Sequence, residues 1–420
     1  MGEFATRRAN LFKALPENSI ALIFSGVSKI ASEDSFLPFL ANRNFFYLTG
    51  IEQENSTLML IKVPGEEKAY LFVDEHNELK ERWTGKRLTF EEASQISELD
   101  NVYSNSTYES MLQMALNSEN NVYGRITNLF IDLSNEIKIK ENCSTQIYAK
   151  ELVEKNPSLK LENIYPLIVE LRLVKSDLEI RELEEAINVT NTAINDLLVN
   201  MHTGMQEHEL SDRFEYYGKT HGRHPLSFET IIGSGVNSTT LHHPVSQQVK
   251  TISSGDVVLF DLGLRYNGYC ADISRTYPVN GTFNEFQRKV YEVVLACNKA
   301  VINYIKPGLS IPDLQEFTIS FLQREGMKAG LFSDPEDVKK YYIHNVSHFL
   351  GLDTHDVGDR KKPLVPGNVI TVEPGLYFVD KEVGVRIEDD VVVTENGCRC
   401  LSRGIKKELD EIEKMLRSIK

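Results

Sequence analysis

The hydrophobic and polar positions of the chain change their pattern near residue 165. Before that point, short apolar runs recur, each with the length expected of a buried strand. These runs occupy residues 19–26, 45–51, 57–63, 69–74, 121–126 and 128–133. Residues 81–96 are charged and have helical spacing, so strands and helices alternate. We therefore expect residues 1–165 to form a first domain of the α/β class.

A long amphipathic helix is expected to open a second domain, residues 166–420. Ser176 and Glu179 have the spacing of a capping box, the side-chain arrangement that starts many helices. Apolar residues then recur at helical spacing, at Ile180, Leu183, Ile187, Ile194 and Leu198. Further helices are predicted near residues 284–305 and 311–328, and the C-terminal segment has the pattern of an amphipathic helix. Strand-like runs lie between them, so the fold class of the whole chain is α/β (α+β).

Composition narrows the classes of function. A chain of 420 residues exceeds one typical core, which agrees with two domains. The net charge of −15 argues against nucleic acid as a partner, because phosphate binding relies on clustered Lys and Arg. No apolar run approaches the roughly 18 residues of a membrane span, so no membrane partner is expected.

The cysteines indicate a reducing environment. They are odd in number and scattered along the chain, unlike a disulfide framework. They are Cys143, Cys270, Cys297, Cys398 and Cys400. The N-terminus lacks the apolar segment of a secretory signal. We therefore expect a cytoplasmic protein.

Two aspartates mark a predicted β-hairpin at residues 256–279. An apolar run leads to Asp261, and Asn267-Gly268 is a strong signal for a tight hairpin turn. If these two residues form the turn, Asp261 faces Ser274, and Asp272 lies one diagonal step away on the same face. Diagonal neighbours are about 7–8 Å apart, so both carboxylates can reach one point. The alternative is that both are solvent-facing residues of an edge hairpin.

Two glutamates repeat the same feature, a carboxylate within β-branched residues. Glu373 ends a Val/Ile strand directly before Pro-Gly, and Glu388 lies within another apolar strand, two residues after Arg386. A carboxylate is costly to bury unpaired, so four of them indicate a bound cation. One divalent ion balances only half of four negative charges, which favours two metal ions.

Three histidines lie close to these carboxylates in the sequence. The segment from residue 344 to 358, "HNVSHFLGLDTHDVG", contains His344, His348 and His355. One imidazole could complete the metal shell and the others could meet a substrate. A set of oxygen ligands with one imidazole suits Mn²⁺, Co²⁺, Fe²⁺ or Zn²⁺. An isolated histidine is more often a core or surface residue whose hydrogen bonds are satisfied. This alternative explains three histidines in one segment less well.

These residues resemble the dinuclear site of the pita-bread metallopeptidases, which include methionine aminopeptidase, prolidase and aminopeptidase P. The likeness covers residues 170–405. It is carried by "DLGLRYNGYCADISRTYPVNG", "HNVSHFLGLDTHDVG", "VITVEPGLYF" and "GVRIEDDVVVTENG". The first half is similar to the non-catalytic domain of aminopeptidase P in "RRANLFKALPENSIALIFSG", "RNFFYLTGIEQENSTLMLI" and "RWTGKRL". That second likeness favours the proline-directed branch.

The resemblance implies a role for each residue. The implied metal ligands are Asp261, Asp272, His348, Glu373 and Glu388. Glu373 would also act as general base, Arg386 would support the carboxylates, and His344 would orient the site. The implied cofactor is a pair of divalent ions, with Mn²⁺ expected first and Co²⁺, Zn²⁺ or Fe²⁺ as alternatives.

Substrate contacts are also implied by the resemblance. His355 and His242 match histidines that contact the substrate, but the segment after His242 departs from the family pattern, which leaves His243 as an alternative. Trp83 matches a tryptophan that a neighbouring subunit lends to the site, and a buried core position is the alternative. A homodimer or homotetramer is therefore expected.

The implied activity is removal of the N-terminal residue from peptides whose second residue is proline. The alternative is a prolidase, restricted to Xaa-Pro dipeptides and built on the same site. A metal-free peptide-binding relative and a creatinase-like hydrolase are disfavoured, because all five ligand positions are intact.

Overall fold

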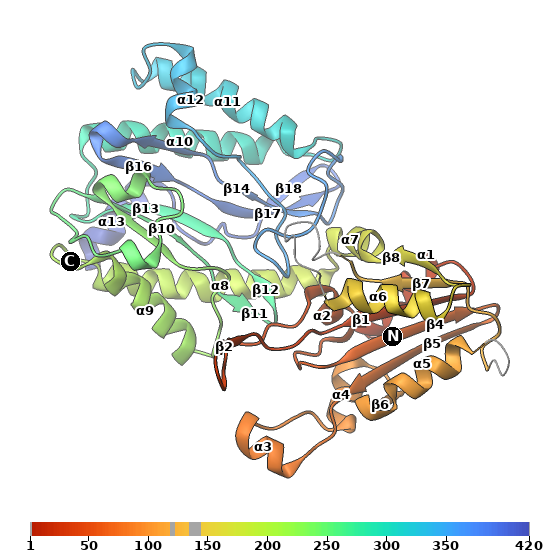
Figure 1. Cartoon of the computed structure of the whole chain (residues 1–420). Helices are drawn as coiled ribbons and strands as arrows, with labels where there is room; N and C mark the ends of the chain where they lie inside the picture. The colour runs from red at the N-terminus through yellow and green to blue at the C-terminus, as the bar shows by residue number, and fades with distance from the viewer. Residues whose placement is uncertain (1, 118–121, 134–143, 420) are drawn as a thin grey trace. The chain divides into compact units, whose positions relative to one another are not determined.

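The computed structural model describes residues 2–117, 122–133 and 144–419, and Cys143 therefore lies outside the described residues. Two compact units can be distinguished, Met1–Arg172 (unit 1) and Leu173–Lys420 (unit 2). The sequence analysis placed the domain boundary after residue 165. Helices and strands are mixed in both units (Figure 1), as the predicted α/β (α+β) class requires.

Unit 1 is built on a six-stranded mixed sheet with the order β6-β5-β4-β1-β7-β8. β4 is antiparallel to both β1 and β5, and the other neighbours are parallel. The strands are β1 (Ser19–Phe24), β4 (Thr57–Val63), β5 (Glu66–Val73), β6 (Val102–Ser104), β7 (Asn128–Ile131) and β8 (Lys160–Asn163). A separate two-stranded ribbon joins β2 (Ile30–Ser32) and β3 (Ser35–Phe36).

The described residues of unit 1 also form helices. They are α1 (Glu3–Ala14), α2 (Arg43–Thr49), α3 (Glu78–Thr84), α4 (Phe90–Ser97), α5 (Tyr108–Leu116), α6 (Ser144–Lys155) and α7 (Tyr165–Leu173), with a 3₁₀ turn η1 (Asn105–Thr107). Alternate residues of the strands, such as Ile20 and Leu22, pack in one core cluster with Leu112 of α5 and Leu152 of α6. The period of two thus places one face of the sheet against these helices.

Two of the apolar runs are not strands. Residues 45–51 lie mostly in α2, whose first N–H groups are capped by the Asn42 side chain and which ends at Gly50 in the left-handed region, φ 67°. A short apolar run cannot be assigned by periodicity alone, and the flanking cap residues decide for a helix here. Residues 122–126 form neither helix nor strand.

The predicted helices of unit 2 are confirmed. Ser176 and Glu179 form both hydrogen bonds of a capping box at the start of α8 (Asp177–Asn200). The others are α9 (Glu207–Thr220), α10 (Glu285–Tyr304), α11 (Ile311–Lys328), α12 (Val338–Tyr341) and α13 (Leu409–Ile419). The short 3₁₀ helices are η3 (Gly235–Thr239), η4 (Val245–Gln247), η5 (Pro335–Asp337) and η6 (Val379–Lys381).

The strands of unit 2 form small antiparallel sheets between α10 on one side and α8 on the other (Figure 1). One sheet has the order β13-β10-β9, and the other has the order β14-β17-β18. Their strands are β9 (Ile231–Ser234), β10 (Val257–Leu262), β13 (Ile273–Pro278), β14 (Val369–Val372), β17 (Asp389–Thr394) and β18 (Gly397–Cys400). Two ribbons pair β11 (Arg265–Tyr266) with β12 (Tyr269–Cys270) and β15 (Gly375–Phe378) with β16 (Val383–Arg386).

The hairpin predicted around the two aspartates is present with the expected register. Asp261 in β10 faces Ser274 in β13. Asn267 and Gly268 turn the chain with φ values of 45° and 88°, and Asn and Gly tolerate such angles best. Within the described ranges, helices are too short or too polar to cross a membrane.

Candidate metal centre

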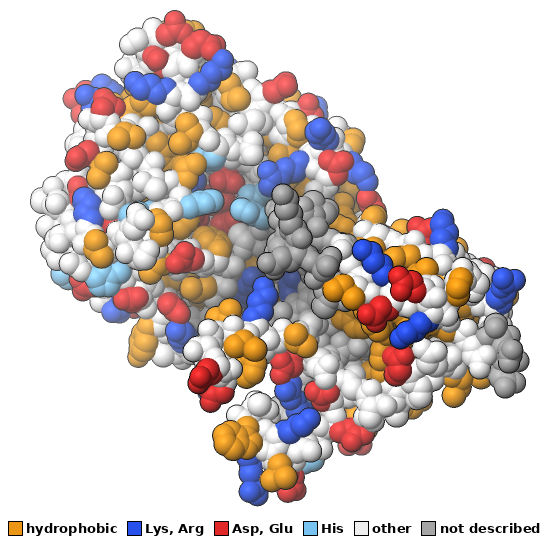
Figure 2. Space-filling view, viewed as in Figure 1, with side chains coloured by type: hydrophobic (Ala, Val, Ile, Leu, Met, Phe, Trp, Pro, Cys, Tyr) orange, Lys and Arg blue, Asp and Glu red, His pale blue; other side chains and the backbone are white. Residues whose placement is uncertain are grey.

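Unit 2 contains a cavity of about 630 Å³ whose wall gathers the ionisable residues predicted for the site. Figure 2 shows histidine and acidic side chains together at a hollow on this unit. The predicted residues on the wall are His242, His243, Asp261, Asp272, His344, His348, His355, Glu373, Arg386 and Glu388.

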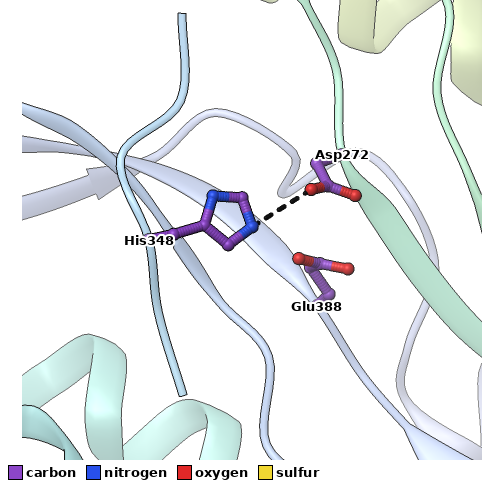
Figure 3. A group of neighbouring side chains, drawn as sticks. All are labelled: Asp272, His348 and Glu388. Atoms are coloured by element: carbon purple, nitrogen blue, oxygen red, sulfur yellow. Dashed lines mark ion pairs between the residues drawn. The ribbon is translucent and has the colours of Figure 1, made fainter. Parts of the chain in front are cut away.

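Asp272, His348 and Glu388 form the tightest group. Each offers one ligand atom, and these atoms lie within 4.8 Å of one another (Figure 3). His348 Nε2 is 3.3 Å from Asp272 Oδ2 and 3.6 Å from the Oε1 atom of Glu373. All three residues of the group are buried. An ion could therefore be bound by oxygen and imidazole nitrogen without moving the backbone.

The expected strand position of Glu388 is wrong in detail. Glu388 lies between β16 and β17, where the chain passes from one sheet to the next. Its N–H donates to the carbonyl oxygen of Ser274 at 3.0 Å, and its Oε2 accepts from the Ser274 hydroxyl at 2.7 Å. The break in the ladder thus fixes this carboxylate close to Asp272, which directly precedes β13.

His348 is oriented for a ligand at its outer nitrogen. Its Nδ1 lies 2.9 Å from the carbonyl oxygen of Phe349, which can only accept, so Nδ1 must carry the proton. Nε2 is then the ring nitrogen directed at the carboxylates. Metal-binding histidines are usually held in this way, by a hydrogen bond from the ring nitrogen that does not bind the metal.

Asp261 is held by Arg386. The Arg386 Nη2 donates to Asp261 Oδ2 at 2.6 Å, its Nε donates to the Ser274 hydroxyl, and its Nη1 donates to the Tyr377 hydroxyl. The other oxygen, Oδ1 of Asp261, is buried and lacks a hydrogen-bond partner among the residues that the structure describes. A buried carboxylate oxygen left in this way fits a cation as its missing partner.

The carboxylates oppose one another electrostatically. Burial and the charges of Asp261 and Asp390 raise the pKa of Asp272 well above its usual range. Burial and the charge of Asp272 do the same to the pKa of Glu388. Burial also raises the pKa of Glu373. Arg386 supplies one positive charge, so the cluster favours additional cationic charge.

Two further histidines stay neutral. Burial lowers the pKa of His344 to about 3, and burial with the neighbouring His348 lowers that of His355 to about 4. The Nε2 of His344 is 2.8 Å from the Tyr377 hydroxyl, and its Nδ1 is 3.7 Å from Glu373 Oε2. The ring of His355 stands edge-on to His348 at 4.3 Å between centroids. Neutral imidazoles at these positions can donate one hydrogen bond each.

The adjacent histidines His242 and His243 differ in environment. His242 is exposed on the cavity wall, whereas His243 is 4% exposed and its Nε2 lies 3.1 Å from Glu207 Oε2. The His242 side chain is therefore accessible from the cavity, whereas that of His243 is held by Glu207. Trp83 lies in α3 of unit 1 and is 90% exposed, so the core alternative for this residue is wrong.

Some residues of the cluster were not predicted from the sequence. Tyr377 contacts both His344 and Arg386, and Asp390 accepts from the backbone N–H of Asp272 at 3.2 Å. Asp390 directly follows Asp389 within an acidic run, and this run is a sequence signal that could have identified Asp390 as a candidate. Nothing in the local pattern around Tyr377 distinguishes it from the other tyrosines.

The donor set fits divalent metal ions. It combines carboxylate oxygens with an imidazole nitrogen that faces them. The buried Oδ1 of Asp261 lacks a hydrogen-bond partner among the described residues. Thiolates are absent from the described cavity wall, which argues against metals that prefer sulfur. The residues present could hold the cations that the sequence predicted.

Comparison with known proteins decides the family. The model of metallopeptidase family M24 matches residues 181–395, which include every proposed metal ligand. The chain belongs to metallopeptidase family M24. The model of the aminopeptidase P N-terminal domain matches residues 4–123. Both halves of the chain thus have the domains that the resemblance implied.

Relatives of this M24 protein match over its whole length. The Xaa-Pro aminopeptidase of Escherichia coli is 32% identical over 99% of this chain and 97% of its own. A solved structure of a candidate aminopeptidase P from Bacillus anthracis has 39% identity and a TM-score of 0.94, covering 99% and 98% of the two chains. The structure of E. coli aminopeptidase P with the inhibitor Pro-Leu has 30% identity and a TM-score of 0.89 at the same coverage. The predicted fold is confirmed.

Proposed function

We propose that this M24 enzyme is a metal-dependent Xaa-Pro aminopeptidase, which removes the N-terminal residue from peptides with proline in the second position. The observation that carries the proposal is the full-length similarity to an enzyme of that name, N-terminal domain included. A prolidase, restricted to dipeptides, is the alternative. The aminopeptidase P N-terminal domain favours the aminopeptidase.

The proposed cofactor is two divalent ions, with Mn²⁺ as the first choice. Asp261, Asp272, His348, Glu373 and Glu388 would hold them. When bound, such ions lower the pKa of a coordinated water and polarise the substrate carbonyl, so that hydrolysis proceeds at neutral pH. E. coli aminopeptidase P has been solved with zinc substituted and product bound, which supports Zn²⁺ as an alternative occupant.

The protein groups would manage the protons. Glu373 would accept a proton from the attacking water and return it to the proline nitrogen, which must be protonated to leave. His355 and His242 would donate hydrogen bonds to the substrate and to the oxyanion that develops. Arg386 would keep Asp261 in place, and His344 would be oriented by its contact with Tyr377.

Substrate selectivity would follow from the chemistry of proline. A peptide bond to proline lacks an N–H group and has a fixed φ, so ordinary peptidases handle it poorly. A cavity shaped for the pyrrolidine ring would select it. The exposed Trp83 supports the proposal that a neighbouring subunit completes the site, in a homodimer or homotetramer.

A cytoplasmic location is also proposed. The four cysteines in the described ranges, Cys270, Cys297, Cys398 and Cys400, are free thiols, which supports a reducing compartment.

The test is an assay of the purified, Mn²⁺-loaded protein on an Xaa-Pro-Xaa tripeptide and an Xaa-Pro dipeptide. Cleavage of the tripeptide that is lost with a chelator and with Glu373→Ala is the expected result. Cleavage of the dipeptide alone would identify a prolidase. Absence of cleavage and of metal binding would contradict both.

A further inference from the structure

The two histidines proposed to meet the substrate lie on segments without helix or strand. His242 is in the turn between η3 and η4, and His355 is in the irregular segment of residues 350–358. Both side chains are exposed to the cavity. No sheet ladder within these described segments fixes the direction of either imidazole. Their position must therefore come from neighbouring side chains.

The residue after His355 is anchored in the interior. Asp356 Oδ2 accepts from the ammonium group of Lys175 at 2.9 Å, and both side chains are 1% exposed. The backbone N–H of Asp356 also donates to the carbonyl of Phe349 at 2.9 Å. Gly351 lies so close that a Cβ atom there would be 2.2 Å from Asp356 Oδ2. The segment is thus packed tightly around this carboxylate.

The residue after His242 is anchored in the same way. His243 lies against Glu207 at 3.1 Å, with side-chain exposures of 5% and 0%. Glu207 also accepts from the backbone N–H and the hydroxyl of Ser234 and from the side-chain amide of Asn237. The carbonyl oxygen of His243 accepts from the buried Gln248 amide at 3.2 Å. Both the side chain and the backbone of His243 are therefore held.

We propose that these two buried pairs, Lys175–Asp356 and Glu207–His243, are positioning residues that aim His355 and His242 at the substrate. Each pair fixes the neighbour of an exposed histidine, so the imidazole gains a set direction without itself being buried. Displacement of a reacting group by about 1 Å can lower a rate about a hundredfold, so such anchoring has a measurable effect. The inference rests on the proposed aminopeptidase function.

Double-mutant cycles on the Mn²⁺-loaded full-length protein test the proposal. One cycle combines His355→Ala with Asp356→Asn, and the other combines His242→Ala with Glu207→Gln, with kcat and KM measured on an Xaa-Pro-Xaa tripeptide. Each positioning variant is expected to lower kcat by about tenfold to a hundredfold, with KM changed by less than about twofold. When the matching histidine is already alanine, the positioning variant should have no further effect on kcat.

Either of two results would overturn the positioning role. If the losses multiply in the double variants, or if folded Asp356→Asn keeps the wild-type kcat, the pairs only stabilise the fold. Removing one buried charge can prevent folding. In that case, the charge-free double variant Lys175→Met with Asp356→Leu replaces the single variant in the cycle, with the same two outcomes.

Glu413→Gln serves as the matched control. Glu413 is 9% exposed at its side chain and accepts from Arg288 at 2.6 Å, and it is not part of the cavity wall. This variant should lower the melting temperature without changing kcat. If the wild-type protein cleaves neither the tripeptide nor the dipeptide, the proposed function is wrong. If the wild type is active but the losses of kcat multiply in the double variants, only the positioning role is wrong.

Discussion

Glu373 has the properties that a general base at neutral pH requires. It directly follows β14 at the cavity wall, and its Oε1 accepts from the Thr371 hydroxyl at 3.4 Å. Burial raises its pKa. Catalysis by proton transfer is most effective when the pKa of the base lies near the working pH. The raised pKa therefore brings this carboxyl closer to its proposed task.

Replacement of Glu373 by glutamine tests that task. Glu373→Gln keeps the size of the side chain and removes its basicity, so kcat should fall by about 10²- to 10⁴-fold. Steady-state kinetics with metal content measured on the same sample provides the check. Glu395→Gln, at an exposed turn, is the control and should retain full activity. A kcat within tenfold of wild type for a metal-loaded Glu373→Gln would contradict the assignment.

The lowered pKa of His344 predicts how the stability of the metal-free protein depends on pH. Its pKa is about 3 in the folded state, whereas an unfolded chain takes up the proton near pH 6.5. The unfolded state therefore binds more protons below pH 6.5, and stability falls as the pH decreases from about 6.5 toward 3. When the pH decreases from 6 to 5, the free energy of unfolding of the wild type should fall by about 1 kcal/mol more than that of His344→Asn.

Urea unfolding at a series of pH values measures this difference. Above about pH 7.5 the imidazole is neutral in both states, so the gap between wild type and His344→Asn should stop changing with pH. Parallel curves for the two proteins from pH 7.5 to 5 would show that His344 titrates normally.

At the scale of elements, the hairpin formed by β10 to β13 brings Asp261 and Asp272 together. Gly263 lies between them in sequence, and a Cβ atom at this position would be 1.9 Å from the carbonyl oxygen of Ala271. Such a contact is far inside van der Waals distance, so the two strands can approach closely only at glycine.

Gly263→Ala is therefore expected to push the hairpin strands apart. We expect a loss of stability of about 1–3 kcal/mol from overpacking, with Mn²⁺ affinity reduced at least tenfold. Thermal unfolding and calorimetric titration with Mn²⁺ measure the two effects. Gly397→Ala, where the nearest atom would be 3.7 Å away, is the control and should change neither. Unchanged Mn²⁺ affinity in Gly263→Ala would contradict the coupling.

The hairpin was predictable because its signal is local. Asn267-Gly268 selects the turn, and the turn sets the register that places Asp261 opposite Ser274. The helix α2 was missed because an apolar run of its length fits either a strand or a buried helix, and only the cap at Asn42 decides. The contact of Tyr377 with Arg386 depends on side-chain packing across strands, which no local pattern encodes.

At the scale of the molecule, each unit has its own sheet and core, and every proposed metal ligand belongs to unit 2. Metal binding should therefore stabilise unit 2 directly. At a metal concentration of a hundred times Kd the gain is about 2.7 kcal/mol, which corresponds to a rise in melting temperature of roughly 5–10 °C.

Chelation and hydrogen exchange test this prediction. Treatment with a chelator should abolish activity and lower the melting temperature, and addition of Mn²⁺ should restore both. Amide protection in β10, β13 and β17 should rise with Mn²⁺, whereas protection in β1 and β4 should change little. Equal changes in both units would contradict a metal centre confined to unit 2.

The proposed ligand set also has a consequence for biosynthesis. Its members come from Asp261 to Glu388, and Glu388 is held by Ser274 from a strand made more than a hundred residues earlier. A nascent chain on the ribosome therefore has most of unit 2 translated before its last ligand exists. Metal loading can be completed only after translation has passed Glu388, and a truncated product that ends earlier would lack a complete centre and could not cleave peptides prematurely.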